Sequence, residues 1–588
     1  MLTGSDKNQH ISNRGISLFK KYFTAYRRPF YLAIACVALE AVCDLMGPTI
    51  MARILDEGVR AKDLSRVGFW GIVMLLVTAA GAVFALVRNA LSSRVSQRVG
   101  AELRRDQFAK ILKFSEAGAD KISSGSLITR QTNDISQIVL FVNGAMRIFL
   151  KAPITCLGSM VLAAMLNFKL SLTVYGVVAL VAVLITLSMK LSYPRFALLQ
   201  KAVDRMNSVV QEYLMGVRLV KAFGTYDAEA QRFGAANDGL MRREVSAQMV
   251  ITLLSPLMTL AISLATALII FLGANLFEAG AATPGDITAF TVYMAQILIA
   301  LTMMTNIFTI FVRTRASAIR ISEVFASEED FAPGGDGSVE SGKVEFEGVR
   351  FAYPGGSGLP ALDGVSFSVE SGRSLAVIGP TGSGKSTLAW LMMRFYDVSG
   401  GRILLGGRDI RELPIEAVRA GVALAPQKAL LFSGTVAENL RWGDPEATDE
   451  ALWAALDMAQ ADFVRRMPEG LESAISGGAV NLSGGQKQRL SIARALVRKA
   501  KLLVIDDATS ALDALTEAKV RDALTHRLGG RTLILITQRC TTAMFADSIL
   551  VLDGGHAVGL GSHKELLETC ETYRALYRSQ VAGEGALA

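Results

Sequence analysis

Residues 374–387 read SLAVIGPTGSGKST and join an aliphatic run to a glycine-rich segment that ends in Lys-Ser-Thr. The aliphatic run predicts a buried strand, and the stretch LAWLMMRF that follows predicts a helix. The segment between them matches the pattern G-x-x-x-x-G-K-[S/T], which is informative in this strand-before, helix-after context. Glycines let backbone N–H groups converge there, and the helix N-terminus adds positive potential. The stretch therefore predicts a phosphate-binding loop rather than a glycine-rich turn without function.

The side chains of this loop have separate predicted roles. Lys385 can reach the β- and γ-phosphates of a nucleotide, and the Ser386 hydroxyl can bind Mg²⁺. ATP and Mg²⁺ are therefore the predicted cofactors. The predicted nucleotide contacts of the loop are Gly379, Thr381, Gly382, Ser383, Gly384, Lys385, Ser386 and Thr387.

Two adjacent acids follow a second aliphatic run in LLVIDDATSALD, residues 502–513. The run predicts a buried parallel strand, whose carboxyl end meets the phosphate-binding loop at one edge of the sheet. Asp506 ends this strand and is predicted to bind Mg²⁺ directly or through a water ligand. A third segment, NLSGGQKQR at residues 481–489, predicts a turn entering a helix that can also hold phosphate with backbone N–H groups.

The first half of the chain is strongly apolar. Hydrophobic residues make up 51% of the 588 residues and charged residues 19%, with a mean hydropathy of +0.37, which is too apolar for an ordinary soluble enzyme. A helix needs ~20 apolar residues to cross a bilayer core. A membrane domain is predicted at 29–320, with helices at about 29–54, 67–87, 145–168, 170–190, 249–277 and 287–312.

Basic residues set the predicted orientation of these helices. The second-to-third and fourth-to-fifth connections are rich in lysine and arginine, whereas the fifth-to-sixth connection has neither. Both termini are therefore predicted to be cytoplasmic, in a multi-pass protein of the cell (inner or cytoplasmic) membrane. The two basic connections have helical periodicity, with short turns expected near 115–125 and 223–233. They also explain the net charge of +8, so no nucleic-acid partner is predicted.

The composition changes near residue 330. The stretch SEEDFAPGGDGSVESG is acidic and rich in glycine and serine, which predicts a linker at 321–340. Short β-like runs then alternate with helical runs, which predicts an α/β ATPase domain at 341–580. The remaining segment, 1–28, is predicted to be cytoplasmic.

Together these features resemble the ATP-binding cassette (ABC) transporters over nearly the whole chain. Six membrane helices followed by one nucleotide-binding domain is the layout of an exporter-type half-transporter. The resemblance implies that Tyr353 stacks on adenine, that Gln427 touches Mg²⁺ and faces the membrane domain, and that Asp513 faces a partner domain. It also identifies the family signature, which consists of Ser483, Gly484, Gly485 and Gln486.

The resemblance implies a dimer, which lies in a lipid membrane. In the family, two nucleotide-binding domains sandwich two ATP molecules, each held between the phosphate loop of one chain and the signature of the other. The turns near 115–125 and 223–233 match the coupling helices that dock onto these domains.

Three positions depart from the family pattern. The family usually has Glu after the magnesium aspartate to polarise the attacking water, and Asp507 is one methylene shorter. A retraction of ~1 Å can cost about 100-fold in rate. The family has His where Gln538 follows the strand TLILIT, and often has Glu where Gly477 stands. Neutral drift is the alternative, but two changes at the residues nearest the γ-phosphate argue against it.

The predicted function is the ATP-binding subunit of a heterodimeric exporter of amphipathic, drug- or lipid-like small molecules. Its own site, with Asp507 and Gln538, is expected to bind ATP and hydrolyse it slowly. Its signature would complete the site of a partner half-transporter with the consensus Glu and His. The alternatives are an importer of siderophores or other small molecules, an ATP-regulated homodimer, and a nucleotide-gated regulator or channel. Six membrane spans exclude a soluble DNA-repair ATPase.

Two acids interrupt the first apolar run. Glu40 and Asp44 are four residues apart and share one helical face. Charges within a membrane are costly and usually face a cavity or a partner. They are therefore candidate cargo or gate residues, and a structural polar contact near the outer membrane surface is the alternative.

Overall fold

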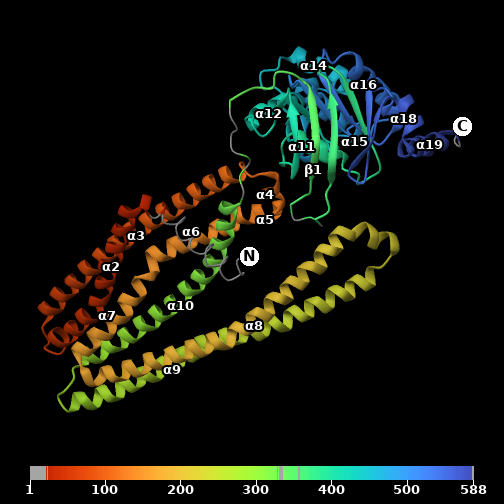
Figure 1. The fold of residues 1–588 in the computed structure, drawn as a ribbon. Coiled ribbons are helices and arrows are strands. Elements are labelled where there is room, and N and C mark those ends of the chain that lie inside the picture. The colour runs from red at the N-terminus through yellow and green to blue at the C-terminus, as the bar shows by residue number, and fades with distance from the viewer. Residues whose placement is uncertain are drawn as a thin grey trace. The chain divides into compact units, whose positions relative to one another are not determined.

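The computed structural model describes residues 21–585 except 23, 328, 330, 332–335, 355 and 357. Most of the predicted N-terminal segment and part of the predicted linker therefore lie outside the described residues. The chain divides into two compact units, drawn in Figure 1. The first contains residues up to 109 and 125–326, and the second contains 110–124 and the residues from 327 onward.

All regular secondary structure in the described residues of the first unit is helical. It contains six helical stretches that are long and apolar enough to cross a membrane, so the predicted six-helix architecture is confirmed. In chain order its elements are α2 (Arg27–Arg53), η1 (Ile54–Val59), α3 (Leu64–Ile111), α5 (Ser124–Thr129), η2 (Arg130–Asp134), α6 (Ile135–Gly144), η3 (Ala145–Phe149), α7 (Lys151–Leu166), α8 (Phe168–Phe223), α9 (Tyr226–Glu278) and α10 (Pro284–Ala326).

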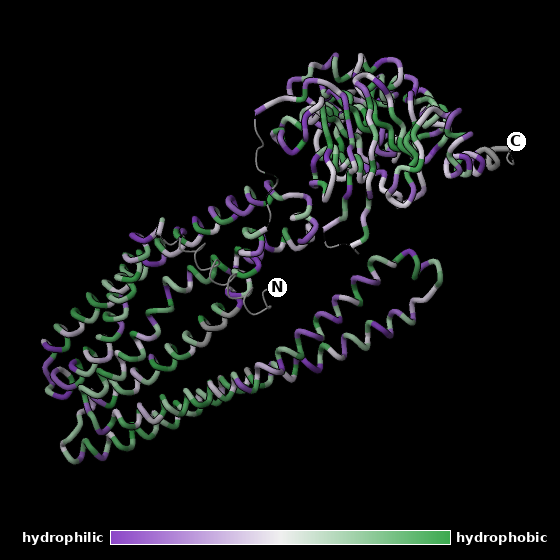
Figure 2. The backbone as a smooth tube through the Cα atoms, in the orientation of Figure 1, coloured by the Kyte–Doolittle hydropathy of each residue, from purple (hydrophilic) through white to green (hydrophobic). Residues whose placement is uncertain are grey.

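The helices extend well past the apolar runs that predicted them. Helix α8 has 56 residues and α9 has 53, about 80 Å each at 1.5 Å per residue, against a bilayer core of ~30 Å. Figure 1 shows the two as a long antiparallel pair. In Figure 2 they are mostly hydrophobic near the α9–α10 connection and mixed toward their shared turn, where Gly224 ends α8 in a left-handed conformation. Both helices therefore have a half that continues beyond a membrane.

Buried hydrogen bonds tie the helices of the first unit together. The hydroxyl of Tyr293 in α10 bonds the Thr49 hydroxyl at 2.7 Å and the Leu45 carbonyl at 3.2 Å, both in α2. In α10, Arg320 and Ser317 both donate to the buried carboxylate of Asp134 in η2. These bonds fix α10 against the N-terminal half of the unit.

The second unit is built on two sheets. A four-stranded antiparallel sheet has the order β2 (Leu362–Val369), β1 (Val344–Phe351), β4 (Gly400–Leu405) and β5 (Arg408–Asp409). A six-stranded sheet has the order β12 (His556–Gly561), β11 (Ser548–Asp553), β3 (Ser374–Ile378), β10 (Thr532–Ile536), β9 (Leu502–Asp506) and β6 (Val422–Ala425). All its strands are parallel except β12, so the α/β prediction is confirmed.

Four parallel strands end at the same edge of the larger sheet. The phosphate-binding loop follows β3, Asp506 ends β9, Gln538 lies two residues after β10, and Gln427 lies two residues after β6. The carboxyl ends of parallel strands are where ligands bind in α/β folds. This topology gathers segments that are up to 160 residues apart in the chain.

Helices and short strands complete the second unit. A small subdomain contains a two-stranded ladder of β7 and β8, and its apolar core includes residues from α13, α14 and α15. The elements not yet located are α4 (Glu116–Asp120), α11 (Lys385–Met392), α12 (Ile415–Gly421), β7 (Gly434–Thr435), α13 (Val436–Arg441), α14 (Asp449–Met458), η4 (Asp462–Arg466), η5 (Gly470–Glu472), β8 (Ala474–Ile475), η6 (Gly477–Ala479), α15 (Gly484–Val497), α16 (Ala514–His526), α17 (Cys540–Ala543), α18 (His563–Thr569) and α19 (Glu571–Gly585).

The segment 110–124 packs on this ATPase fold although it lies early in the sequence. Ser115 caps the short helix α4 by accepting from Gly118 N–H. The buried phenol of Tyr396 donates to Asp120 Oδ2 at 2.9 Å, and this acceptor together with burial raises the pKa of Tyr396. Lys110 forms an ion pair of 2.7 Å with Glu329. The first predicted turn is therefore anchored to the nucleotide-binding domain of the same chain.

Candidate nucleotide-binding site

The loop between β3 and α11 requires glycine at two positions. Gly384 has φ +96°, and a Cβ on it would meet the Ala361 carbonyl at 2.5 Å. A Cβ on Gly379 would clash with the Leu552 carbonyl and the Ser383 hydroxyl. Both positions therefore need glycine for the loop to close over the N-terminus of α11.

Lys385, the first residue of α11, lies inside the loop. Its ammonium group donates to the carbonyls of Gly379 at 2.8 Å and Pro380 at 2.7 Å. Burial lowers the pKa of Lys385, and the nearby carboxylates of Asp507 and Asp506 act in the opposite direction. Among the described residues no carboxylate forms a direct ion pair with it, and its hydrogen bonds go to the two carbonyls. A buried cation without an ion pair suits an anionic ligand.

The hydroxyl of Ser386 donates to Asp506 Oδ1 at 3.0 Å, so a hydroxyl and a carboxylate converge at the sheet edge. Burial raises the pKa of Asp506, and the Ser386 bond partly offsets this. Among the described residues the buried Ser383 hydroxyl has no hydrogen-bond partner. Oxygen ligands of this kind are what Mg²⁺ prefers, so Ser386 and Asp506 fit a magnesium ion bound with phosphate.

Asp507 is held by two amide side chains. Gln427 Nε2 donates to Asp507 Oδ2 at 3.2 Å, and Gln538 Nε2 donates to the same oxygen at 3.3 Å. Asp507 has φ +48°, a left-handed conformation that aspartate tolerates better than most residues. Burial raises its pKa, while the Gln427 bond and the Lys385 charge lower it. Three predicted residues from three strand ends thus meet at one oxygen atom.

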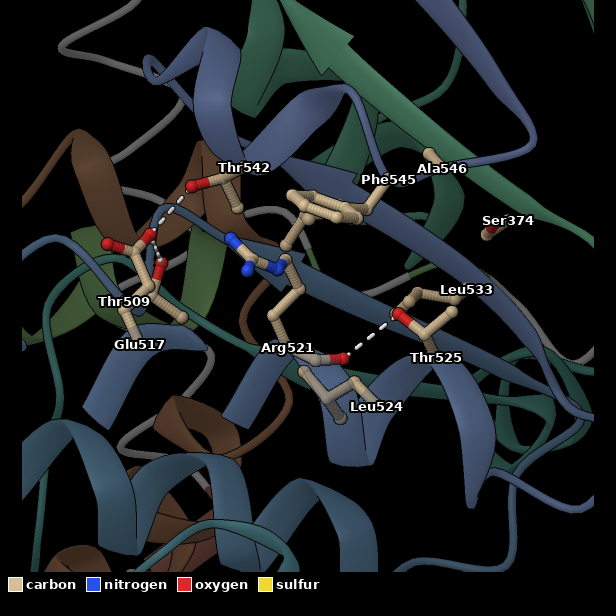
Figure 3. A pocket seen from close by; sticks show the side chains of 11 residues that line it. Ser374, Thr509, Glu517, Arg521, Leu524, Thr525, Leu533, Thr542, Phe545 and Ala546 are labelled. Atoms are coloured by element: carbon tan, nitrogen blue, oxygen red, sulfur yellow. Dashed lines mark hydrogen bonds between the residues drawn. The ribbon is translucent and has the colours of Figure 1, made fainter. Parts of the chain in front are cut away.

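Glu517 of α16 organises the segments that flank this centre, and the sequence did not predict it. Figure 3 shows its buried carboxylate between the hydroxyls of Thr509 and Thr542, which donate at 3.1 and 2.8 Å. Arg539, the neighbour of Gln538, also pairs with it and donates to the Ser510 carbonyl at 3.3 Å. The sequence does contain a signal that Glu517 is buried, because it lies on the same face of α16 as the buried Val520 and Leu524.

The signature residues begin α15. Ser483 and Gln486 form a reciprocal capping box, in which each side chain bonds the backbone N–H of the other. Further along α15, Gln488 bonds Ser510 and the backbone N–H of Ala511, so the helix is tied to the segment after Asp507. No hydrogen bond within the described part of the chain joins Ser483, Gly484, Gly485 or Gln486 to the phosphate loop.

The remaining predicted residues have local partners. Asp513 caps α16 by accepting from Thr516 N–H at 2.9 Å, and this bond lowers its pKa. The hydroxyl of Tyr353 bonds the Thr387 hydroxyl at 2.9 Å, and burial raises the pKa of Tyr353. Its ring packs edge-on against Phe351 and Tyr396. Tyr353 therefore lies beside the helix that carries Lys385 and Ser386.

Glu40 and Asp44 have basic partners within the first unit. The buried Glu40 pairs with Lys151 at 2.5 Å and with Arg88 at 3.1 Å, and Lys151 also pairs with Asp44 at 2.8 Å. The pairing favours a structural contact over attraction of cationic cargo.

Both units match known families. Residues 30–301 match the ABC transporter transmembrane region, and residues 362–510 match the ABC transporter ATP-binding model. An uncharacterized ABC transporter ATP-binding protein of Bacillus subtilis is 36% identical over 94% of this chain and 97% of its own length. The chain belongs to the ABC transporter family. It is therefore an ATPase coupled to transport, in a half-transporter of the exporter type.

Other ABC transporters are also similar. A multidrug efflux ATP-binding/permease protein of Mycobacterium bovis is 32% identical over 94% of this chain and 46% of its own length. An ATP-dependent lipid A-core flippase of Dechloromonas aromatica is 32% identical over 96% of this chain and 97% of its own length. The solved structure of a bacterial Atm1-family ABC exporter with ATP bound has a TM-score of 0.77 and 27% identity, covering 94% of this chain and 98% of that one.

Proposed function

We propose that this ABC half-transporter is the ATP-holding subunit of a heterodimeric exporter. Its phosphate loop, Ser386 and Asp506 bind MgATP, and Asp507 supports only slow hydrolysis. Its signature at Ser483–Gln486 completes the faster site of a partner chain that has Glu and His at the positions of Asp507 and Gln538. In this proposal both termini lie on the cytoplasmic side of the cell membrane.

The surroundings of Asp507 carry this proposal. The aspartate side chain is short, and one of its oxygens already accepts from two amides, Gln427 and Gln538. A carboxylate that polarises a water needs a free oxygen within hydrogen-bond reach of that water. In this proposal the two amides occupy one oxygen of Asp507, and the short side chain holds the other oxygen farther from the attacking water than a glutamate side chain would.

The long helical pair supports a dimer. Leu214, Leu219 and Phe223 lie in the half of α8 beyond the membrane and have 65%, 63% and 74% of their surface exposed in the single chain. Apolar side chains of this number on a water-facing helix indicate a protein partner. The family resemblance matches the turn near 223–233 to a coupling helix that docks onto the nucleotide-binding domains of such a dimer.

We assign amphipathic cargo by analogy with the relatives. One is named a multidrug efflux protein and another a lipid A-core flippase, so drug-like or lipid-like molecules are the cargo class that we propose. The charges at Glu40 are neutralised by Arg88 and Lys151, so cationic character is not proposed as the selected feature.

Restoring the missing methylene tests the slow site. Asp507→Glu should raise ATP hydrolysis by this chain's own site, because ~1 Å in the position of the carboxylate can change the hydrolysis rate up to 100-fold. Asp507→Asn should leave the ATP turnover of the heterodimer within about twofold. The Glu→Gln change at the matching position of the partner should abolish turnover. Equal losses from Asp507→Asn and the partner change would refute the asymmetry.

Assembly gives a second test. Native mass spectrometry of the purified chain, alone and with a candidate partner half-transporter, should show the heterodimer as the species with transport-coupled ATPase activity. A homodimer with full coupled activity would instead support the ATP-regulated or self-sufficient homodimer.

A further inference from the structure

The C-terminal helix α19 packs on the nucleotide-binding fold through one face. Tyr573, Leu576, Tyr577 and Gln580 recur at spacings of three and four residues, so they lie on the same side of the helix. Tyr573 is fully buried, and its hydroxyl bonds His563 Nδ1 at 2.7 Å. Leu576 and Tyr577 pack on the apolar cluster that contains Cys540. The position of Gln580 is therefore fixed by the residues one and two turns before it.

Gln580 spans the backbone of the segment that follows β10. Its Nε2 donates to the Gln538 carbonyl at 2.8 Å, and its Oε1 accepts from the Cys540 N–H at 2.8 Å. The amide thus bonds the C=O of one residue and the N–H of the residue two positions later. These two bonds replace those that a neighbouring strand would make. The segment needs this support because it has left the sheet after Ile536.

The opposite side of the same segment is held by Glu517. The side chain of Arg539, between the two residues that Gln580 binds, pairs with Glu517, and the Thr542 hydroxyl donates to the same carboxylate. Gln580 of α19 thus bonds the backbone of the segment, and Glu517 of α16 bonds its side chains. Between these two supports, the Gln538 amide reaches Asp507 at 3.3 Å.

We propose that Gln580 is a positioning residue for the ATP site. By fixing the backbone of Gln538 it sets where the Gln538 amide meets Asp507, and the C-terminal helix thereby controls the chemistry of an ATP site that it does not touch. The inference concerns the same site as the proposed function, but it stands whether that site is slow or fast. Only the size of the hydrolysis rate depends on the proposed function.

The test uses the full-length chain with Gln580→Ala, Gln580→Glu and the control Ser579→Ala, whose exposed hydroxyl donates to the Leu576 carbonyl within α19. Hydrogen–deuterium exchange of a peptide covering 537–543 needs no turnover. Its rate should rise about two- to tenfold in Gln580→Ala, as expected for one lost hydrogen bond, and stay unchanged in the control. Gln580→Glu retains the acceptor for Cys540 and should give a smaller rise.

The kinetic arm separates positioning from general damage to the fold. In the purified chain alone, where turnover comes from this chain's own site, Gln580→Ala should lower ATP turnover about tenfold while changing the ATP concentration for half-maximal rate less than twofold, because a positioning error affects the reacting geometry more than binding. In a Gln538→Ala background, Gln580→Ala should have no further effect on turnover. Unchanged exchange at 537–543, or a full additional loss in the Gln538→Ala background, would overturn the inference.

Discussion

At the scale of single residues, the site concentrates charge in a buried space. Lys385 is mostly buried and, within the described part of the chain, bonds two carbonyls, while Asp506 and Asp507 lie near it at the end of β9. Burial opposes all three charges, since it lowers the pKa of the lysine and raises the pKa of both carboxyls. Binding sites commonly keep such groups at the expense of stability.

The effect of burying a charge on stability can be measured at Asp507. Its folded-state pKa is raised, so its contribution to folding is most favourable below the unfolded pKa of ~3.9 and is lost as pH rises through the folded pKa. At neutral pH the charge therefore destabilises the nucleotide-free protein. Asp507→Asn should raise the midpoint of thermal unfolding at pH 7.5, and the gain should shrink toward pH 5. A gain that grows on acidification would contradict this reasoning.

Tyr353 gives a prediction for binding. If its ring stacks on adenine, Tyr353→Ala should weaken ATP binding by about 1–3 kcal/mol, which is roughly 5- to 150-fold. Tyr353→Phe keeps the ring and loses only the bond to Thr387, so it should cost less than the alanine change. Calorimetric titration of the full-length protein with MgATP measures both. Equal losses would assign the effect to the hydroxyl instead.

The sequence predicted the residues that come from strand ends and missed those that support them. Ser386 and Asp506 could be grouped, because parallel strands deliver their ends to one edge, whereas Gln427 and Gln538 were predicted from the family resemblance. Gln580 could not, since its contact to the Gln538 backbone depends on how α19 packs on the sheet. That packing is a tertiary property that no local pattern encodes.

At the scale of elements, the structure shows the partners of the charges in α2. Hydropathy predicted six membrane helices, because a membrane span needs a long apolar run, but it could not show which helices would bring basic partners to Glu40. Arg88 of α3 and Lys151 of α7 do so. The carboxylate thus joins three helices and is not free to bind a cation.

This pairing predicts that Glu40 and Asp44 differ strongly in how much they contribute to stability. Glu40 is almost fully buried and bonds both bases, whereas the side chain of Asp44 is 44% exposed. Breaking a buried ion pair leaves an uncompensated charge and costs about 3–5 kcal/mol. Glu40→Gln should therefore lower the thermal unfolding midpoint in lipid nanodiscs much more than Asp44→Asn does. Similar shifts for both variants would show that burial does not decide the effect.

At the scale of the whole molecule, the exposed half of α8 predicts a dependence on a partner. Leu219 lies 51 residues after the start of α8, about 76 Å along the helix and beyond a ~30 Å bilayer core. Leu219→Glu should therefore remove the dimer in native mass spectrometry without unfolding the chain. Lys201→Glu, an exposed charge reversal on the same helix, serves as the control. A dimer that survives Leu219→Glu would exclude this face as the interface.

The anchoring of α4 on the nucleotide-binding fold has a consequence for biosynthesis. Asp120 and its partner Tyr396 are 276 residues apart, so at ~5–20 residues per second the ribosome makes the second about 14–55 s after the first. During that interval the short helix has no surface on which to pack. The membrane helices on either side of it must therefore enter the bilayer before their cytoplasmic connection acquires its final fold, and a chain that stops after α10 would never complete it.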